Sequence, residues 1–233
     1  MNAVITGASK GIGKAIAEKL AREGFNIAIC ARNSDTLAQA VADIRAQNTQ
    51  VEVFSISADM SKKEDVLAFA GKVKSFFPVI DILVNNAGVF VPGRLDEQED
   101  GLLESMMAAN VYSAYHLTRQ LLPAMKAIRK GHIFNLCSTA SYTSYPNGGA
   151  YSITKFALYG LTKVLREEMK PYGIRVTAVL PGATLTASWE GVDLPAERFM
   201  KAEDVAEAMY SAFALSKQSV VEEILIRPQL GDI

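Results

Sequence analysis

Short apolar runs alternate along the whole chain with longer stretches whose apolar residues recur every three to four positions. The short runs are rich in β-branched residues and predict strands, whereas the periodic stretches predict helices. We expect strands at 2–6, 26–30, 51–57, 80–84, 131–137, 174–179 and 223–227. We expect helices at 11–23, 34–47, 62–76, 99–127, 149–171 and 202–214. Such alternation is typical of parallel βαβ units and predicts an α/β fold.

Composition sets the number of domains and limits the class of partner. The 233 residues are 49% apolar, enough for one large core, and no repeat or linker divides them, so we expect a single domain over 1–233. A net charge of −1 argues against nucleic acid and against an anionic membrane as partners. The first predicted strand is entered by residue 3, and no apolar run approaches the ~18 residues of a membrane span. We therefore expect a cytoplasmic protein without a signal peptide.

The cysteines and histidines add little chemistry. Cys30 and Cys137 both lie in strand-like apolar runs, which predicts reduced thiols in the core. His116 and His132 have no carboxylate or cysteine at ligand spacing, so we expect no metal site.

A glycine-rich turn follows the first predicted strand and precedes the first predicted helix. Glycines at this position let the backbone turn tightly and approach a pyrophosphate, which binds at the helix N-terminus. The spacing is Gly-x3-Gly-x-Gly, not the commoner Gly-x-Gly-x2-Gly, and such turns also occur without a cofactor. The residues that we expect to contact a dinucleotide here are Gly7, Ser9, Lys10, Gly11, Ile12 and Gly13.

Tyr151 and Lys155 lie four residues apart in a predicted helix. At this spacing a phenol and an ammonium share one helix face, so the cation can favour the phenolate and lower a pKa that is about 10 in isolation. Ser138 ends an apolar run thirteen residues before the tyrosine, and its hydroxyl can hold a carbonyl oxygen beside the phenol. These three residues predict proton transfer, although Tyr-x3-Lys by itself can also be a surface pair.

Together these motifs resemble those of the short-chain dehydrogenase/reductase family. They occur in the family's order and spacing over nearly the whole chain, as Thr6-Gly7-x3-Gly11-x-Gly13, Asn85-Asn86-Ala87-Gly88, Asn110, Ser138, Tyr151-x3-Lys155 and Pro181-Gly182. The resemblance implies one doubly wound parallel sheet of the Rossmann type and a nicotinamide dinucleotide. It also implies a catalytic tetrad of Asn110, Ser138, Tyr151 and Lys155.

The family's chemistry assigns a role to each member of this tetrad. Hydride passes between the nicotinamide and a carbonyl carbon, while Tyr151 exchanges a proton with the oxygen and Ser138 orients it. Lys155 is implied to bind the nicotinamide ribose and to keep the pKa of Tyr151 low. Asn110 is implied to position a water in a proton relay through Lys155, the alternative being a helix asparagine that faces solvent.

The second predicted strand indicates which dinucleotide is bound. A carboxylate at the end of this strand accepts hydrogen bonds from the ribose of NAD, but here Arg32 stands in that place. A guanidinium suits the 2′-phosphate of NADP, and Lys10 adds a second positive charge, so we expect NADP(H). Both could instead be ordinary solvated cations. Asp35 we assign to the first turn of the next helix.

Further cofactor contacts follow from the same resemblance, near the adenine, the inner ribose and the nicotinamide. They are expected at Asn33, Asp59, Met60, Asn86, Ala87, Gly88, Pro181, Gly182, Ala183 and Thr184. Asn85, in contrast, is expected to brace the sheet.

The substrate is less well determined. Residues 182–201 form the longest irregular stretch and predict a lid that holds Trp189. The C-terminal tail lacks the glycine pair of acyl-carrier ketoacyl reductases and resembles that of bacterial sepiapterin-reductase-type members. Glu190 and Asp193 make the lid acidic, which disfavours acidic carrier proteins.

We therefore expect carbonyl reduction of a compact ketone, such as a sepiapterin-like or dicarbonyl molecule. A 3-oxoacyl-thioester reductase, an extended-branch isomerase or dehydratase, and a non-catalytic NADP-binding regulator are the alternatives. Asp232 could pair with a guanidine-like ring edge or could simply be solvated. The apolar helices 99–127 and 149–171 predict a homodimer or homotetramer.

Overall fold

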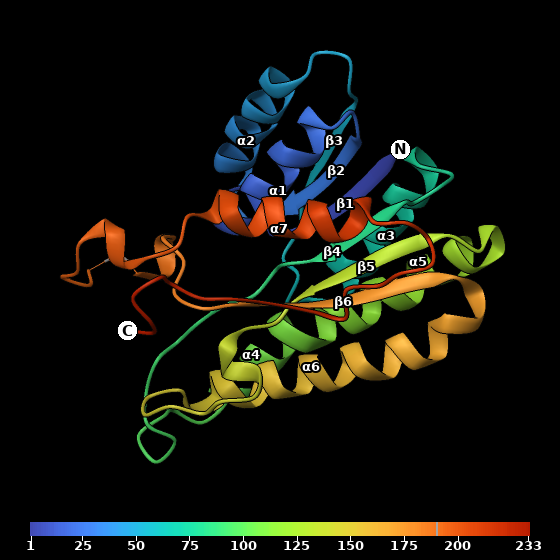
Figure 1. The fold of residues 1–233 in the computed structure, drawn as a ribbon. Helices are drawn as coiled ribbons and strands as arrows, with labels where there is room; N and C mark the ends of the chain where they lie inside the picture. Colours follow the sequence, from blue (N-terminus) through green and yellow to red (C-terminus); the bar gives the residue numbers. More distant parts are fainter. Residues whose placement is uncertain (190) are drawn as a thin grey trace.

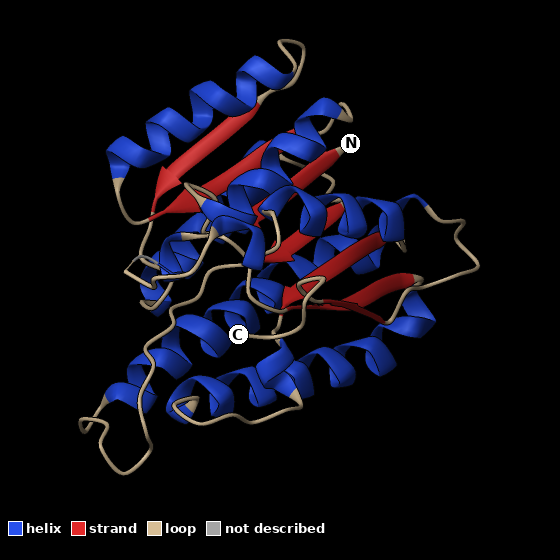
Figure 2. Cartoon of the chain, turned by 60° about the vertical axis from the view of Figure 1, so that its left-hand side comes forward, coloured by secondary structure: helices blue, strands red, loops and turns tan. Residues whose placement is uncertain are grey.

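The computed structural model describes residues 1–189 and 191–233, in which seven parallel strands form one sheet with helices on both faces (Figures 1 and 2). The strands are β1 (Asn2–Thr6), β2 (Asn26–Ala31), β3 (Val53–Ser57), β4 (Ile82–Asn85), β5 (Gly131–Leu136), β6 (Ile174–Pro181) and β7 (Glu223–Ile226). The α-helices are α1 (Gly11–Arg22), α2 (Ser34–Gln47), α3 (Lys63–Phe76), α4 (Leu102–Met107), α5 (Ser113–Ile128), α6 (Gly149–Met169) and α7 (Ala202–Ala214).

The strand order is β3-β2-β1-β4-β5-β6-β7, and every neighbouring pair is parallel. The order reverses between β1 and β4, which is the topological switch point of a doubly wound sheet. The predicted α/β fold with a doubly wound parallel sheet is thus confirmed. Because all strands run in one direction, their carboxyl ends meet at a single edge, and ligands of such sheets bind there.

Both faces of the sheet are covered. α1, α2 and α7 lie over one face, and α3, α5 and α6 lie over the other (Figure 1). Side chains alternate between the two cores along each strand, so that Ile5 packs with α1 and α7 while Val4 packs with α3 and α5. This double burial explains why the central strands are almost continuously apolar in sequence.

The observed elements start and end within a few residues of the predicted ones, with one informative difference. The helix expected at 99–127 begins at Leu102 and contains a π-helical turn, η1 (Ala108–Tyr112), between α4 and α5. A π-turn inserts one extra residue into the helical ladder and is frequent at functional sites. Hydrophobic periodicity does not register such an insertion, because the flanking turns remain helical.

Buried amides and hydroxyls tie the middle of the sheet to the helices of one face. The Asn85 side chain donates to Thr118 on α5 at 3.0 Å and to Asn135 on β5 at 2.8 Å. Asn135 in turn donates to Thr162 on α6 at 2.8 Å. The expectation that Asn85 braces the sheet is confirmed.

Other expectations concern side chains of the core. Cys30 and Cys137 are both buried and unpaired, and burial raises the pKa of the Cys30 thiol to about 12 and that of the Cys137 thiol to about 11. Within residues 1–189 and 191–233, no three histidine, cysteine or acidic side chains group as metal ligands would. In the same residues no helix is both long and apolar enough to cross a membrane.

Candidate active site

A cleft of about 1440 Å³ opens at the carboxyl edge of the sheet. It brings together segments from β1, β2, β4, β5, α6 and β6 that are far apart in sequence. The predicted site residues that line it are Gly7, Ser9, Lys10, Gly11, Ile12, Gly13, Arg32, Asp59, Met60, Asn86, Ala87, Gly88, Ser138, Tyr151, Lys155, Pro181, Gly182, Ala183 and Thr184. Asn33 and Asn110 do not line the cleft.

The three glycines of the β1–α1 turn have two different physical roles. Gly7 and Gly11 have φ angles of +65° and +57°, a region that residues with a Cβ adopt only at a cost. Gly13 lies in α1 and is required for close packing instead. A Cβ at this position would lie 2.3 Å from Asn86 Nδ2 and 2.5 Å from the Gly7 carbonyl oxygen.

A reciprocal set of hydrogen bonds holds this turn against the end of β4. The Thr6 hydroxyl accepts from the backbone N–H groups of Asn86 and Ala87 at 3.0 and 2.9 Å. The Asn86 side chain donates to the carbonyl oxygens of Thr6 and Gly7, both at 2.9 Å. We refer to these contacts as the Thr6–Asn86 clasp. Asn86 therefore lines the cleft while its own amide supports the glycine turn.

The first turn of α1 fits a phosphate group. α1 lies wholly within the described residues and has no side-chain cap and no acidic residue in its first turn. Its first N–H groups have no partners within the helix and lie at the positive end of the helix dipole. Lys10, just before the helix, adds a positive charge. Together with the left-handed glycines, these residues form a cradle suited to a pyrophosphate.

Arg32 stands at the end of β2, where the cleft reaches the edge of the sheet. Its side chain is exposed and makes no hydrogen bond or ion pair with the residues that the structure describes. Asp59 lies nearby, and its carboxyl pKa is lowered. Partial burial acts in the opposite direction, but hydrogen bonds from Ser61 and the charges of Arg32 and Lys62 outweigh it. The guanidinium is thus available to a ligand.

Asn33 does not line the cleft, and its expected contact with the dinucleotide stays a prediction. Its side chain accepts from the N–H groups of Asp35 and Thr36 at 3.0 and 2.9 Å, which makes it the N-cap of α2. Asp35 lies in the first turn of this helix, as predicted. The asparagine oxygen thereby satisfies two N–H groups of the first turn of α2 that have no partner within the helix.

Tyr151 is largely buried at the floor of the cleft. The edge of the Phe90 ring meets it with a centroid distance of 4.8 Å. Burial raises the pKa of the Tyr151 phenol to about 12, and a hydrogen bond with Ser138 only partly opposes this. The sequence expectation of a lowered pKa is therefore wrong for the folded chain. Burial destabilises the phenolate by removing its hydration, and this effect is larger than the stabilisation that the neighbouring groups provide.

The charge of Lys155 does not prevent the rise in the pKa of the Tyr151 phenol, because Lys155 is itself buried. Its side chain is 6% exposed, and its Nζ donates to the Leu136 carbonyl oxygen at 2.7 Å. The Nζ lies 5.5 Å from the centroid of the Tyr151 ring. Burial lowers the pKa of this ammonium from 10.5 to about 8, so the amine is largely neutral at the higher pH at which the phenol titrates and cannot stabilise the phenolate there.

Ser138 is held in place by a short helix, η2 (Thr139–Ser141). Its hydroxyl oxygen accepts from the N–H of Ala140 at 3.1 Å, and the Ser141 hydroxyl accepts from the N–H of Ser138 at 3.2 Å. This capping box fixes the serine beside Tyr151, with its hydroxyl in the cleft.

Asn110 lies in the π-helical turn and is 1% exposed. Its side-chain oxygen accepts from the N–H of Val89 at 2.7 Å, and its nitrogen donates to the Val89 carbonyl at 3.0 Å and to Thr154 Oγ1 at 2.9 Å. The alternative of a solvent-facing asparagine is excluded. Asn110 instead links the segment after β4 to α6, one residue before Lys155.

Sequence reasoning did not single out Thr154 or Phe90. Thr154 accepts from Asn110 and donates to the Tyr151 carbonyl oxygen at 2.8 Å, and Phe90 packs on the tyrosine ring. Thr154 lies inside the Tyr-x3-Lys motif and Phe90 just after the Asn-Asn-Ala-Gly motif, and proximity to these motifs is the signal that could have found them.

The predicted lid, residues 182–201, borders the cleft over the described part of its length. A bridge between Thr184 and Met200 joins its two ends, and Trp189 packs against Phe199 at 5.1 Å. Thr186 reaches across to the glycine turn, since its Cγ2 would lie 3.1 Å from a Cβ on Gly11. The expectation for Glu190 falls outside the described residues.

The C-terminal tail also reaches the cleft. The Asp232 carboxylate pairs with the Arg227 guanidinium at 2.5 Å, and this guanidinium also donates to the Tyr142 hydroxyl at 2.9 Å. Asp232 Oδ1 would lie 3.3 Å from a Cβ on Gly182. The Asp232 side chain is 48% exposed, so it is partly solvated as well as ion-paired, and its contact with a ligand stays a prediction.

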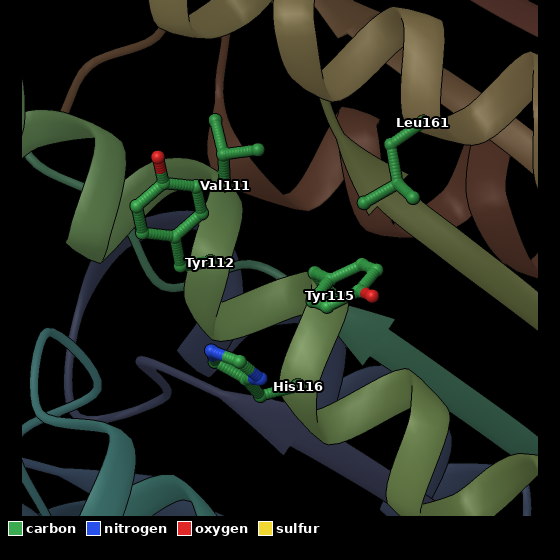
Figure 3. A pocket seen from close by; sticks show the side chains of 5 residues that line it. All are labelled: Val111, Tyr112, Tyr115, His116 and Leu161. Atoms are coloured by element: carbon green, nitrogen blue, oxygen red, sulfur yellow. The ribbon is translucent and has the colours of Figure 1, made fainter.

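A second, smaller hollow of about 320 Å³ lies on the outer side of η1, α5 and α6 (Figure 3). It is lined by Val111, Tyr112, Tyr115, His116 and Leu161. Large apolar side chains of α6 are exposed as well, at Ile153, Phe156 and Val164. We refer to the hollow together with these side chains as the α5–α6 face.

The cleft therefore combines two kinds of chemistry. At one end, backbone amides and cations can hold a phosphorylated ligand. At the other end, a phenol that stays protonated at neutral pH lies beside a hydroxyl that can hold an oxygen atom. This second arrangement suits donation of a proton to a carbonyl oxygen.

Known proteins match the chain over nearly its whole length. The profile of the family described as short chain dehydrogenase matches residues 1–195. An uncharacterized oxidoreductase of Staphylococcus saprophyticus is 33% identical over 226 residues, which cover 97% of this chain and 96% of that protein. A sepiapterin reductase of Chlorobaculum tepidum is 32% identical over 238 residues, covering 99% and 97%. A crystal structure of an alcohol dehydrogenase from Thermococcus sibiricus, complexed with 5-hydroxy-NADP, has a TM-score of 0.92 at 33% identity, covering 100% and 98%.

The burial of Lys155 predicts a measurable pH dependence of stability. Between pH 8 and pH 10.5 the folded protein binds fewer protons at this residue than the unfolded chain does, so stability from this group rises with pH in that window. Lowering the pKa from 10.5 to about 8 corresponds to roughly 3 kcal/mol. The quantity to compare is the difference in unfolding free energy between the wild type and Lys155→Met. We expect this difference to increase by roughly 3 kcal/mol, in favour of the wild type, from pH 7 to pH 10.5.

Chemical denaturation across this pH range measures the difference. Lys163→Met, at an exposed lysine of the same helix, is the matched control and should give a difference that stays constant. A constant difference for Lys155→Met as well would show that burial does not disfavour its ammonium.

Proposed function

The chain belongs to the short chain dehydrogenase family, and on this premise we propose that it is an NADPH-dependent reductase that converts the ketone of a small molecule to a secondary alcohol. The observation that carries the proposal is the grouping of Ser138, Tyr151 and Lys155 in one cleft whose other end suits a dinucleotide. The reverse reaction would use the same groups in the opposite direction.

In this reaction NADPH, when bound, supplies a hydride to the carbonyl carbon. Tyr151 donates its phenolic proton to the carbonyl oxygen, and the Ser138 hydroxyl holds that oxygen in line. Lys155 would bind the nicotinamide ribose, and Pro181 and Gly182 would lie along the nicotinamide amide. Asn110 would support this arrangement by holding the segment at Val89 against α6, and a water at its remaining oxygen lone pair could extend the proton relay.

The choice of NADPH over NADH rests on charge. No carboxylate stands at the end of β2, and the unpaired Arg32 guanidinium there can form a charge-assisted bond with a 2′-phosphate. Lys10, beside the glycine turn, also lines the cleft. The related alcohol dehydrogenase, which binds 5-hydroxy-NADP, supports the same choice.

The substrate proposal rests on the aromatic and lid residues of the cleft. Phe90, Tyr145, Trp189, Val192 and Asp232 line it, and Phe90 packs on the Tyr151 ring. Aromatic walls and a lid suit a compact or flat ketone, such as a sepiapterin-like or dicarbonyl molecule. The similarity to a sepiapterin reductase supports this class. The exposed Asp193 on the lid would repel an acidic carrier protein.

We also propose that the protein is a cytoplasmic homodimer or homotetramer that associates through the α5–α6 face. Tyr112, Phe156 and Val164 are 50%, 47% and 55% exposed on this face. Contiguous apolar surface of this kind is uncommon on monomers and is covered in oligomers. The two unpaired, buried cysteines fit a reducing compartment.

The reaction can be tested with a panel of carbonyl compounds that contains a pterin ketone, small diketones and a β-ketoacyl thioester, each assayed by loss of NADPH absorbance. We expect a compact ketone to give the highest kcat/KM. Tyr151→Phe should reduce kcat by about 10²- to 10⁴-fold with NADPH affinity nearly unchanged, because it removes the acid and little binding surface.

Tyr172→Phe, a tyrosine that does not line the cleft, is the matched control. If Tyr151→Phe retains more than about a tenth of the activity, Tyr151 is not the proton donor. A higher kcat/KM for the thioester would favour a 3-oxoacyl-thioester reductase. Binding of NADPH without turnover of any panel member would favour a non-catalytic regulator.

Cofactor preference is tested at Arg32. We expect tighter binding of NADPH than of NADH, and we expect Arg32→Asp to weaken NADPH binding by roughly ten- to a hundredfold, the size of a lost charge-assisted hydrogen bond. Titration with each dinucleotide measures the two affinities. Arg22→Asp, at an exposed arginine of α1 outside the cleft, should leave both unchanged. Equal wild-type affinities for the two cofactors would show that Arg32 is only a solvated cation.

Assembly is tested by sedimentation at micromolar concentration. We expect a multiple of the 25.2 kDa chain mass, and we expect Phe156→Glu to shift it toward the monomer because a charge cannot be buried at an apolar contact without cost. Leu67→Glu, at an exposed leucine of α3, should leave the mass unchanged. A wild-type monomer would refute the proposal.

A further inference from the structure

The helix that carries Tyr151 and Lys155 begins without a cap of its own. α6 starts at Gly149, and the residue before it is Gly148, which has no side chain to accept a hydrogen bond. The first N–H groups of a helix need such an acceptor or water, and leaving them without one loosens the first turn. Tyr151 lies in this turn, so its position depends on how the turn is held.

The missing cap comes from another part of the chain. The N–H of Ala150 donates to Gln98 Oε1 at 2.9 Å, across a separation of 52 residues. Ala150 is the second residue of α6, and its amide is one of those that an ordinary N-cap side chain would satisfy. Gln98 belongs to the loop between β4 and α4 (residues 86–101), which lies beside the segment leading into α6 (Figure 1).

The loop itself makes Gln98 stand out. Within residues 91–100 all residues are exposed except Gly93 and Gln98, which are partly buried. The neighbouring backbone bond, from the N–H of Gly93 to the Asn147 carbonyl at 2.9 Å, joins the same two segments. An otherwise solvated loop is therefore attached to the start of α6 at Gln98 and Gly93.

The Gln98 amide also fits closely against the helix backbone. A Cβ on Gly149 would lie 2.5 Å from Gln98 Nε2 and 2.5 Å from the Gly93 carbonyl oxygen, and Gly149 has a φ of +37°. A side chain at position 149 would thus displace the glutamine. The Gln98 oxygen makes the contact with Ala150, because an N–H group needs an acceptor. The Gln98 Nε2 atom is buried and has no hydrogen-bond partner among the described residues.

The same loop touches the reactive residue directly. Phe90, at the start of the loop, meets the Tyr151 ring edge to face, and Gln98 holds the residue just before this tyrosine. We propose that Gln98 is a positioning residue that caps α6 from the β4–α4 loop and thereby fixes the Tyr151 phenol for proton transfer. It acts through Ala150 and does not line the cleft.

This inference rests on the proposed function for its kinetic test, but its structural part can be measured without turnover. The informative pair of variants is Gln98→Met, which keeps the length and removes the acceptor, and Gln98→Glu, which keeps an acceptor oxygen. A carboxylate is also favoured next to the positive end of the helix dipole. Glu97→Met, at the exposed neighbouring position, is the matched control.

The first measurement is hydrogen–deuterium exchange of the protein without cofactor. We expect the peptide that contains Ala150 and Tyr151 to exchange faster in Gln98→Met than in the wild type. Gln98→Glu and Glu97→Met should retain wild-type exchange there. This result does not depend on which reaction the protein catalyses.

The second measurement is steady-state kinetics on the best ketone of the panel. Displacement of a reacting group by about 1 Å can cost about a hundredfold, so we expect Gln98→Met to lower kcat by roughly 10- to 100-fold with little change in the KM for NADPH. Gln98→Glu should restore most of the kcat.

Either of two results would overturn the inference. One is unchanged exchange at Ala150 in Gln98→Met, which would show that Gln98 does not cap the helix. The other is faster exchange with an unchanged kcat, which would show that the cap does not position Tyr151. If the wild type reduces no ketone, the proposed function fails, and the exchange experiment still decides whether the cap exists.

Discussion

The Thr6–Asn86 clasp is the interaction on which the architecture of the cleft depends. It joins the ends of β1 and β4, the two strands between which the sheet order reverses, through four hydrogen bonds of 2.9 to 3.0 Å. The amide of Asn86 fills the space that a side chain on Gly13 would need, so α1 can pack close to both strands. The glycine turn is thereby fixed next to the segment that leads to Asn110 and Phe90, and the cofactor end of the cleft is connected to its reactive end.

At the reactive end, burial is the dominant physical effect. It raises the pKa of the Tyr151 phenol and lowers that of the Lys155 ammonium, because in both residues the charged form loses its water. The phenol is therefore protonated at neutral pH, and the ammonium releases its proton more readily than an exposed lysine does. Such a phenol could donate its proton to an oxygen atom placed beside it, as the proposed reaction requires.

The position of these two groups is set by contacts between α6 and the β4–α4 loop. Asn110 connects Val89 with Thr154, and Gln98 reaches the N–H of Ala150, so α6 is held on both sides of Tyr151 by polar side chains of other segments. Neither Asn110 nor Gln98 lines the cleft. The precision of the site thus comes from hydrogen bonds behind its surface. Residues of the lid and Asp232 of the C-terminal tail also line the cleft.

The sequence by itself determined the strands and helices, the glycine turn at Gly7 and Gly11, and the approach of Ser138, Tyr151 and Lys155, because periodicity and motif spacing are local properties. Only the tertiary structure decided the sign of the Tyr151 pKa change, since desolvation depends on every segment packed around the phenol. It also decided that Asn33 caps α2, that Asn110 bonds to Val89 and Thr154, and that Asp232 pairs with Arg227. Gln98 could not be recognised from sequence, because its partner lies 52 residues away and no pattern links the two positions. Contacts of this kind exist only once the sheet has brought its loops to one edge.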